Sequence, residues 1–479
     1  MIEEEVNNMT AQETDGAAAG KGGGGWSFFD RVKGDKVVWI VVLLLIMISL
    51  TAISGSTSLL ALQNGTTRVS LFTRHLLVCA GGLALIFFCY FVPSMKWFEK
   101  LSKYGFLVSF LLLVPLLLRE HFNIADIIKA EYLNGAWRVI RVWKFQVNVF
   151  EVVKVAMVMY LAWACKTYRN DGFTLSKKIA AIRTGKEHDK TPFSFMNTRL
   201  AQLVFYIVIP IAATAMMILP GGNSSAIFIG LVMGATMVIG RVEFKYILLT
   251  LAVGVTLLGS AYGLYKLSEG KLFTRIGTGL ERSKDDPTPD DLFRIKDEKG
   301  ENSTEYKKAL QKMQQPYSAK IAIHEGGLFG KGIGGSTQKY VVPQIYGDFM
   351  FSFILEETGL LGGIAIIILY LSLLARGTII VSNSEDDFAK TAAGGLVLLI
   401  AGQAFMHILI NLDMGPLTGQ TLPMISHGSG SFLCFSLAFG IILAMSKTAK
   451  NKTAAEERKI DLEHGRPAEE EISADTGDF

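Results

Sequence analysis

Long apolar runs recur along most of the chain and are separated by charge-rich stretches. A helix needs roughly 20 mostly apolar residues to cross a bilayer, and about ten runs approach that length. The runs are continuous and do not alternate apolar with polar residues, so they predict helices and not barrel strands. With 50% hydrophobic and 19% charged residues, the composition excludes a disordered chain, a coiled coil and a cytosolic enzyme. The chain is therefore predicted to be an all-α integral membrane protein, with spans at Val37–Ile53, Leu76–Val92, Tyr104–Leu118, Val149–Ala164, Leu200–Leu219, Ala226–Gly240, Tyr246–Tyr265, Phe349–Ala375, Thr391–Ile410 and Phe432–Met445.

The distribution of positive charge predicts the topology. With the amino terminus in the cytoplasm, most lysines and arginines between the spans fall on the cytoplasmic side, and both termini are cytoplasmic. The predicted organisation is a disordered tail over residues 1–35, a membrane domain over 36–446 and a disordered acidic tail over 447–479. A charge-rich extracytoplasmic loop covers residues 267–347, with a solvated first half. The four cysteines lie in or beside apolar runs, so disulfides and a thiolate metal site are not expected.

One short outer loop breaks the charge pattern. The segment between the third and fourth spans holds five cations where the rule disfavours them. Such a cluster could bind an anionic ligand such as a lipid-linked pyrophosphate, since guanidinium groups suit phosphate oxygens. Contact with anionic lipid headgroups is the simpler alternative. The five residues are Arg119, Lys129, Arg138, Arg141 and Lys144.

Ionisable side chains at membrane depth are costly, so each is a functional candidate. Glu151 and Lys154 share one helix face and are close enough to pair; the alternative to a functional role is an ion pair that locks helix packing. Glu356 and Glu357 could act in chemistry or could cap and bridge helices. A further polar face on the ninth span is expected to serve interhelical hydrogen bonding more than metal or proton chemistry. It consists of Gln403, His407 and Asn411.

Asp348 is the strongest catalytic candidate. It follows Tyr346-Gly347 at a loop-to-helix junction, faces the outer side in the predicted topology and has no adjacent cation in sequence. A capping role is the alternative, because a helix amino terminus favours a carboxylate. The glycine-rich run over residues 326–336 is not a nucleotide loop, since Gly332 follows Lys331 where a Walker A motif needs Ser or Thr. It presents Gln338 and Lys339 just before Asp348.

Several motifs of the chain are similar to those of a known family. Residues 326–339 (GGLFGKGIGGSTQK) and 343–359 (PQIYGDFMFSFILEETG) resemble the patterns G-x-x-G-x-G-x-G-x-S-x-Q-K and P-E-x-H-T-D-F-I-F-x-x-x-x-E-E-x-G of the SEDS (shape, elongation, division, sporulation) family. Residues 416–431 (PLTGQTLPMISHGSGS) are similar to P-x-T-G-x-x-L-P-x-x-S-Y-G-G-S-S. Gly135-Ala-Trp-Arg138 and Glu151-x-x-Lys154 fit its G-A-x-R-W…Q-P-S-E-x-x-K pattern. The resemblance extends from about Lys36 to Met445 and implies a fold of ten spans with one large outer loop.

The chain departs from the family pattern at several positions. The His-Thr before the aspartate is Tyr346-Gly347, and the Trp after the matched arginine is Val139. The Q-P-S and Q-P-D-x-G-T patterns appear as residues 148–150 (NVF) and 219–224 (LPGGNS). The aspartate itself is retained as Asp348.

The resemblance implies a peptidoglycan glycosyltransferase of the bacterial inner membrane that polymerises lipid II on the outer face. Asp348 matches the family's essential aspartate and would act as general base or hold a divalent cation, Mg or Mn. Stabilisation of the undecaprenyl pyrophosphate leaving group is assigned to Arg138, Arg141 and Lys339. The remaining expected substrate-binding residues are Glu151, Lys154, Gln338, Ser426 and His427.

The implied partners are lipid II, the growing undecaprenyl-diphosphate-linked glycan, a class B penicillin-binding transpeptidase, other divisome proteins and membrane lipids, with no nucleic acid. Within the family, a septal cell-division role is favoured over an elongation role because of the long tails. Two other functions stay open. One is a non-catalytic lipid II translocase, in which Glu151, Lys154 and His407 line a polar path. The other is a scaffold that only activates the transpeptidase.

Overall fold

The computed structural model describes residues 34–63, 65–118, 123–124, 128–133, 136–143, 145–176, 194–268, 289–342, 345–415 and 419–463. Most of the predicted amino-terminal tail, together with Arg119 and Lys144 of the predicted basic loop, lies outside these residues.

Each predicted span lies within a helical segment or extends one residue beyond one of its ends. Asp35 begins the first span, because its side chain accepts hydrogen bonds from the backbone N–H groups of Val37 (3.0 Å) and Val38 (3.2 Å) and so satisfies two donors at the helix start. The helices are α3 (Lys36–Ser56), α5 (Arg68–Phe91), α7 (Gly105–Leu118), α8 (Val149–Arg169), α10 (Arg199–Leu203) continued by the π-turn η4 (Val204–Val208) and α11 (Ile209–Ile218), α12 (Asn223–Ile239), α13 (Phe244–Leu267), α17 (Met350–Asn383), α18 (Asp387–Asn411) and α19 (Ser429–Glu463).

By length and composition, seven of the described helices could cross a membrane. An eighth forms if α6 (Met95–Ser102) and α7, which meet at a bend of 47°, count as one span. Two of the ten predicted spans fall short of this criterion for simple reasons: α12 has 17 residues, and α8 carries charged residues at both ends and at Lys154. The result is a multi-pass helical membrane protein.

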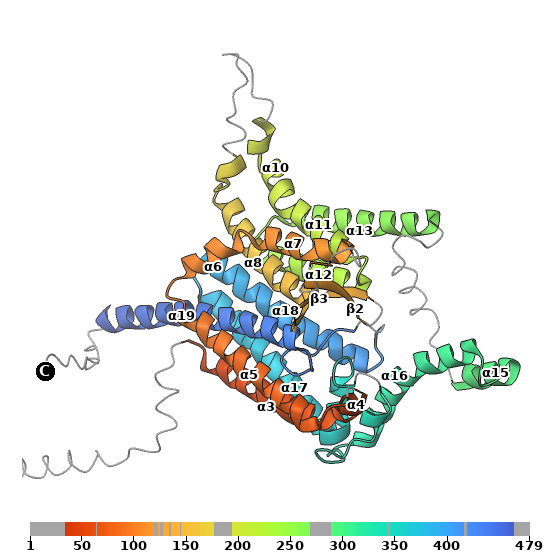
Figure 1. Ribbon diagram of the computed structural model, residues 1–479. Helices are drawn as coiled ribbons and strands as arrows, with labels where there is room; N and C mark the ends of the chain where they lie inside the picture. Colours follow the sequence, from red (N-terminus) through yellow and green to blue (C-terminus); the bar gives the residue numbers. More distant parts are fainter. Residues whose placement is uncertain are drawn as a thin grey trace, which may run out of the picture.

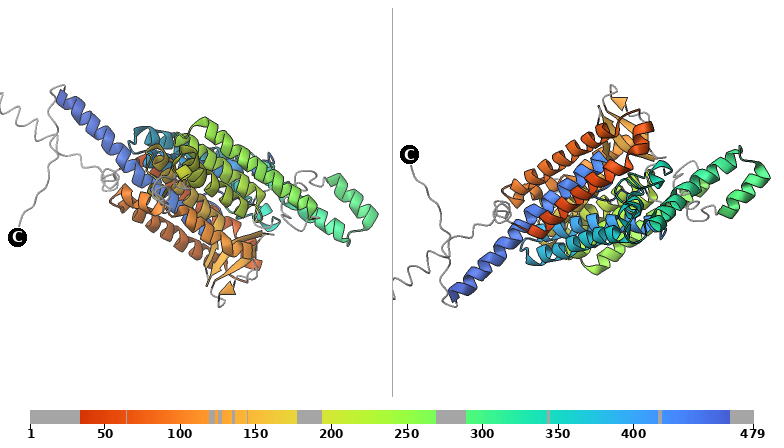
Figure 2. Two further views of the ribbon diagram at one scale, coloured as in Figure 1. Left: turned by 90° about the horizontal axis from the view of Figure 1, so that it is seen from above. Right: turned by 90° about the horizontal axis from the view of Figure 1, so that it is seen from below.

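The helices pack side by side in a bundle with two distinct ends (Figure 1). Strands β2 (Ile128–Leu133) and β3 (Ala136–Val142) and the helices α4 (Ser58–Gln63), α15 (Pro289–Lys299) and α16 (Thr304–Gly326) lie at one end, which we name the sheet end. The carboxy-terminal part of α19 leaves the bundle at the opposite end. Two further views show α15 and α16 projecting beyond the sheet end (Figure 2).

Two apolar clusters form the core, and α8 contributes to both. One cluster joins α3, α5, α17, α18 and α19, and α8 adds Val155 and Val158 to it. The other cluster joins α7, α11 and α12, and α8 adds Val153 and Met157 to it. These four α8 residues are at most 4% exposed, so α8 is buried against both apolar clusters.

The segment after α7, which was predicted to be an outer loop, forms a sheet and adds strands to the predicted all-α fold. Four antiparallel strands run in the order β1–β2–β3–β4, with bounds Asn123–Ile124, Ile128–Leu133, Ala136–Val142 and Phe145–Asn148. In the pairing of β2 with β3, Lys129 lies opposite Arg141. Val, Ile and aromatic residues in these strands favour an extended backbone. Because each strand is short and the sheet lies between two apolar spans, this sequence pattern was not recognised as a sheet.

Two charged segments are also more helical than predicted. The predicted extracytoplasmic loop contains α15, α16 and the short 3₁₀ helix η5 (Gln338–Tyr340). Helix α19 runs to Glu463, so the described part of the tail after residue 446 is helical. The segment that follows is rich in Ala, Glu, Lys and Arg, which are strong helix formers even without an apolar face.

Candidate functional site

Asp348 lies in the turn that leads into α17 and is half-buried at the sheet end. The carbonyl oxygens of residues 346–348 each accept a hydrogen bond from another segment. In order, the donors are the His427 backbone N–H at 2.8 Å, the Ser426 hydroxyl at 2.8 Å and the Asn411 side-chain amide at 3.1 Å. Three successive fixed carbonyls leave the backbone at Asp348 little freedom, so the direction of its carboxylate is set by the surrounding fold.

Arg138 of β3 reaches the same place from the sheet. Its Nη1 atom donates a hydrogen bond to the Gly419 carbonyl at 3.5 Å. A Cβ atom built on Gly419 would lie 3.3 Å from Arg138 Nη1 and 3.5 Å from Asp348 Oδ2. The guanidinium and the carboxylate therefore both border Gly419, which has a φ of +63° that glycine adopts without strain.

A buried polar cluster lies deeper in the bundle. The ammonium of Lys154 donates to Glu151 Oε1 at 3.0 Å, to Gln403 Oε1 at 2.7 Å and to Gln420 Oε1 at 2.9 Å. Gln420 in turn donates to the Ser225 hydroxyl at 2.7 Å. The predicted pairing of Glu151 with Lys154 is confirmed, and the cluster joins α8, α12, α18 and the segment that follows α18.

Two residues of α18 connect this cluster to Asp348. His407 Nδ1 lies 2.7 Å from the carbonyl oxygen of Gln420. One turn further, Asn411 holds the Asp348 carbonyl and accepts from the Ser352 hydroxyl at 2.8 Å. The predicted role of this helix face in hydrogen bonding between segments is confirmed, because each contact joins α18 to another element.

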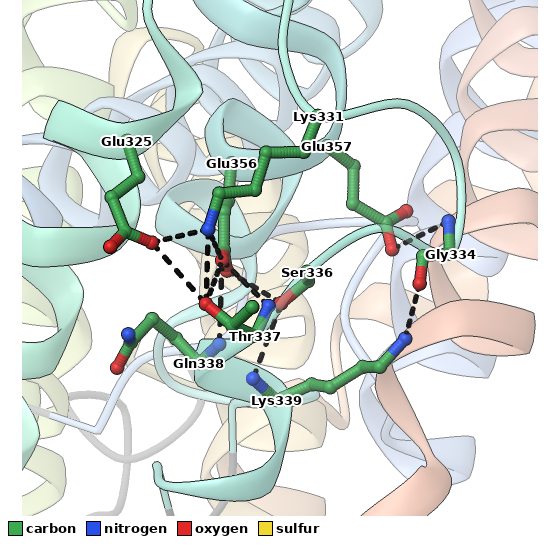
Figure 3. A network of polar contacts seen from close by, with 9 residues as sticks. All are labelled: Glu325, Lys331, Gly334, Ser336, Thr337, Gln338, Lys339, Glu356 and Glu357. Atoms are coloured by element: carbon green, nitrogen blue, oxygen red, sulfur yellow. Dashed lines mark hydrogen bonds and ion pairs between the residues drawn. The ribbon is translucent and has the colours of Figure 1, made fainter.

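The glycine-rich segment wraps around the acidic pair of α17 (Figure 3). Glu356 Oε1 accepts from the Lys331 ammonium at 3.0 Å and from the Thr337 backbone N–H at 2.7 Å. Glu357 Oε1 accepts from the Gly334 backbone N–H at 2.9 Å. The two carboxylates thus accept hydrogen bonds from a loop that is poor in side chains, whereas the alternative considered above was that they cap or bridge helices.

The other predicted phosphate-binding cations lie in less direct positions. Arg141 forms an ion pair with Glu131 across the sheet. Lys339 is 4% exposed, and its ammonium donates to the Gly334 carbonyl at 2.6 Å. Gln338 precedes it in η5 and donates its backbone N–H to Glu356 at 3.3 Å. Of the predicted cations among the described residues, Arg138 is the one that borders Gly419 together with Asp348.

Ser426 and His427 lie behind Asp348 and hold its backbone. The Ser426 hydroxyl also accepts from the Leu422 backbone N–H at 2.9 Å, which folds the segment into a turn. Burial and the nearby Arg74 guanidinium lower the pKa of His427 to about 4. Burial and the Asp348 carboxylate raise the pKa of Tyr346. Both rings are therefore uncharged at neutral pH.

Sequence reasoning missed Gln420 and Gly419. Gln420 supplies both the side chain that binds Lys154 and the carbonyl beside His407. It lies 266 residues from Lys154, so no spacing rule could join the two residues. Its place inside the motif of residues 416–431 was the one available signal.

The residues around Asp348 do not form a metal centre by themselves. Among the described residues, no group of three or more His, Cys, Asp or Glu side chains could hold a metal ion. A guanidinium, that of Arg138, borders the same space as the Asp348 carboxylate. The donor set around Asp348 among the described residues thus does not fit the predicted divalent cation.

The fold and the site define a multi-pass membrane protein with an aspartate-centred polar site at one end of its helix bundle. A family model described as cell cycle protein (FtsW, RodA, SpoVE) matches residues 35–451. The chain belongs to this family, which confirms the resemblance drawn from its motifs.

Relatives and solved structures agree with this assignment. The probable peptidoglycan glycosyltransferase FtsW of Coxiella burnetii is 26% identical over 430 residues, covering 86% of this chain and 96% of the relative. The FtsW of Pseudomonas fluorescens is 25% identical, covering 85% and 86%. A solved structure described as coordinating polymerization and crosslinking in a peptidoglycan synthase complex superposes with a TM-score of 0.55 at 16% identity, covering 87% of this chain and 98% of that one. It shows that the fold is shared.

Proposed function

We propose that this protein is a peptidoglycan glycosyltransferase that polymerises lipid II at the outer face of the inner membrane, in septal wall synthesis. The main supporting observation is that the side chains of Asp348 and Arg138 both border Gly419, at the sheet end of the bundle. A carboxylate and a guanidinium side by side suit a reaction that removes a proton at one atom and releases a phosphate at another. Relatives that align with most of the chain are named as glycosyltransferases of the division type.

In the proposed reaction, Asp348 accepts the proton of the acceptor sugar hydroxyl. The hydroxyl oxygen forms a bond to the anomeric carbon of the donor chain. The bond from that carbon to the pyrophosphate oxygen breaks, and undecaprenyl pyrophosphate leaves with the electron pair. Arg138 stabilises the negative charge that develops on the leaving group. The donor is already activated as a pyrophosphate ester, so the reaction needs no ATP.

The polar contacts behind the site support this mechanism by keeping the base in one geometry. The carbonyls of residues 346–348 are all fixed, so Asp348 needs little reorganisation when the substrate arrives. We assign the sheet end to the extracytoplasmic side on the positive-inside pattern, with both termini cytoplasmic. A class B penicillin-binding transpeptidase is the proposed partner, in line with the peptidoglycan synthase complex that shares this fold.

Polymerisation of fluorescent lipid II by the purified protein, alone and with its cognate transpeptidase, tests the proposal. Wild type should form glycan strands, whereas Asp348→Ala and Asp348→Asn should lose at least about a hundredfold in rate while keeping their unfolding temperature. A matched control is Asp290→Asn, on exposed α15, which should polymerise like wild type.

The same experiment separates the two other functions. Lipid II transport across vesicles by both Asp348 variants, without polymer from wild type, would favour a translocase that uses the buried polar cluster. Stimulation of the transpeptidase without polymer would favour a scaffold. Either result would overturn the glycosyltransferase proposal.

A further inference from the structure

Tyr346 and His427 form a direct contact beside Asp348. Their ring centroids are 5.6 Å apart with an interplanar angle of 84°, an edge-to-face arrangement that aromatic rings favour. The backbone N–H of His427 also donates to the Tyr346 carbonyl at 2.8 Å. A ring contact and a backbone hydrogen bond thus both connect His427 to Tyr346, which lies two positions before Asp348.

The contact has a rigid support on its far side. The His75 ring of α5 packs on His427 at 5.8 Å. His75 Nε2 lies 2.8 Å from the hydroxyl of Ser49 on α3, and that hydroxyl donates to the Ile425 carbonyl at 3.0 Å. Tyr346 therefore rests on a ring that two transmembrane helices hold in place, and a change in either ring would move the turn that carries Asp348.

The sequence adds an independent observation. The motif patterns given above have His at position 346 and Tyr at position 427, and this chain has Tyr346 and His427 instead. Read position by position, these are two separate departures. In the fold they are one contact that retains one phenol and one imidazole with their places exchanged.

Charge does not account for the contact. His427 stays neutral above a pH of about 4 because it is buried and faces Arg74. The other titratable groups packed around the pair are His75 of α5 and Asp348 itself. The pair thus acts through shape and hydrogen-bonding groups.

We propose that Tyr346 and His427 are a pair of positioning residues that set the direction of the Asp348 carboxylate, and that the two ring types can be exchanged only together. The inference rests on the proposed glycosyl transfer. It predicts that either single exchange displaces the turn, whereas the double exchange restores one phenol and one imidazole and so restores the geometry.

A double-mutant cycle tests the inference with Tyr346→His, His427→Tyr and the combined variant. Each single variant should lower kcat for lipid II polymerisation by about tenfold or more with KM changed by less than about threefold, because misplacing a general base by a fraction of an ångström slows chemistry more than binding. The combined variant should recover to within about threefold of wild type, which is strong coupling for residues in contact. Matched controls are Tyr340→His and His324→Tyr, at exposed positions, which should leave kcat unchanged.

Additive losses in kcat, or losses confined to KM, would overturn the positioning role. The unfolding temperature of the four proteins gives a second readout that needs no activity. Coupling there supports the contact itself, and additivity there rejects it. If wild type forms no polymer under any condition, the proposed function fails and the positioning role fails with it, while the contact is still judged by the unfolding temperatures.

Discussion

Gly419 borders both charged groups of the candidate site, Arg138 and Asp348. A methyl group on Gly419 would contact both of them, at 3.3 Å from Arg138 Nη1 and 3.5 Å from Asp348 Oδ2. Such contacts lie outside what spacing rules can reach. The sequence could identify Asp348 as a carboxylate at a helix entrance. Only the family resemblance assigned Arg138 to the same site, and neither reasoning identified Gly419, which lies 281 positions from Arg138.

Gly419→Ala tests this arrangement. The substitution costs about 1–2 kcal/mol in backbone strain and also places a methyl group between the guanidinium and the carboxylate. We expect the polymerisation rate to fall by about tenfold or more, together with a modest loss of stability. Steady-state kinetics and thermal unfolding measure the two effects.

Gly300→Ala is the matched control. Gly300 has a φ of +82°, and nothing lies within 4 Å of its virtual Cβ, so the backbone strain is similar but no site is entered. It should lose stability and keep its activity. Equal activity losses in the two variants would mean that strain alone, and not the position of Gly419, explains the effect.

At the scale of elements, α17 combines a membrane span with the support of the glycine-rich segment. The helix departs from helical geometry at Gly359, where φ is 71° and ψ is −171°. At this break the Leu360 backbone N–H donates to the Gly327 carbonyl at 2.9 Å. The span itself could be predicted from hydropathy. The break and the loop seated in it could not, because they depend on backbone approach and not on side-chain pattern.

Gly359→Ala should prevent normal folding. Its Cβ would lie 2.3 Å from the Leu328 carbonyl oxygen and 2.4 Å from the Gly330 nitrogen, and both of those atoms belong to the backbone. Size-exclusion chromatography and thermal unfolding after membrane extraction should show little folded protein. Gly254→Ala on α13, with nothing within 4 Å, should behave like wild type; a well-folded Gly359→Ala protein would contradict this account.

The four strands, helices α15 and α16 and the last part of α19 were not predicted from the sequence. Apolar runs identify transmembrane helices because every backbone group in lipid must be hydrogen-bonded within the chain. The sheet of residues 123–148 and helices α15 and α16 lie outside the apolar runs, so hydropathy does not identify these elements. The continuation of α19 depends on intrinsic helix propensity, which the acidic composition of the tail obscured.

At the scale of the whole molecule, Lys154 is the centre of the buried polar cluster. It lies on α8, which contributes to both apolar clusters, and it donates hydrogen bonds to Gln403 and Gln420. Removal of one partner from a buried ion pair leaves an uncompensated charge and costs about 3–5 kcal/mol. The ion pair was predictable from the three-residue spacing, but its location on the helix shared by the two apolar clusters was not.

Lys154→Met should therefore lower the unfolding temperature strongly, and the double variant Glu151→Gln/Lys154→Met should recover part of the loss. Lys245→Met is the control, because its partner Glu243 is exposed and a surface pair contributes less than about 1 kcal/mol. Differential scanning fluorimetry in one detergent compares the four proteins. A Lys154→Met variant as stable as the Lys245→Met variant would exclude a structural role for the cluster.

Helix α13 stands apart from this tightly joined core. Only 6% of its most apolar window is buried inside the protein, and Ala261 is its one buried residue. In a bilayer, the exposed side chains of such a span would contact acyl chains, and lipid would then be its main structural partner. The thickness and composition of the surrounding lipid should then set its tilt, and extraction into detergent should loosen this helix before any other part of the bundle.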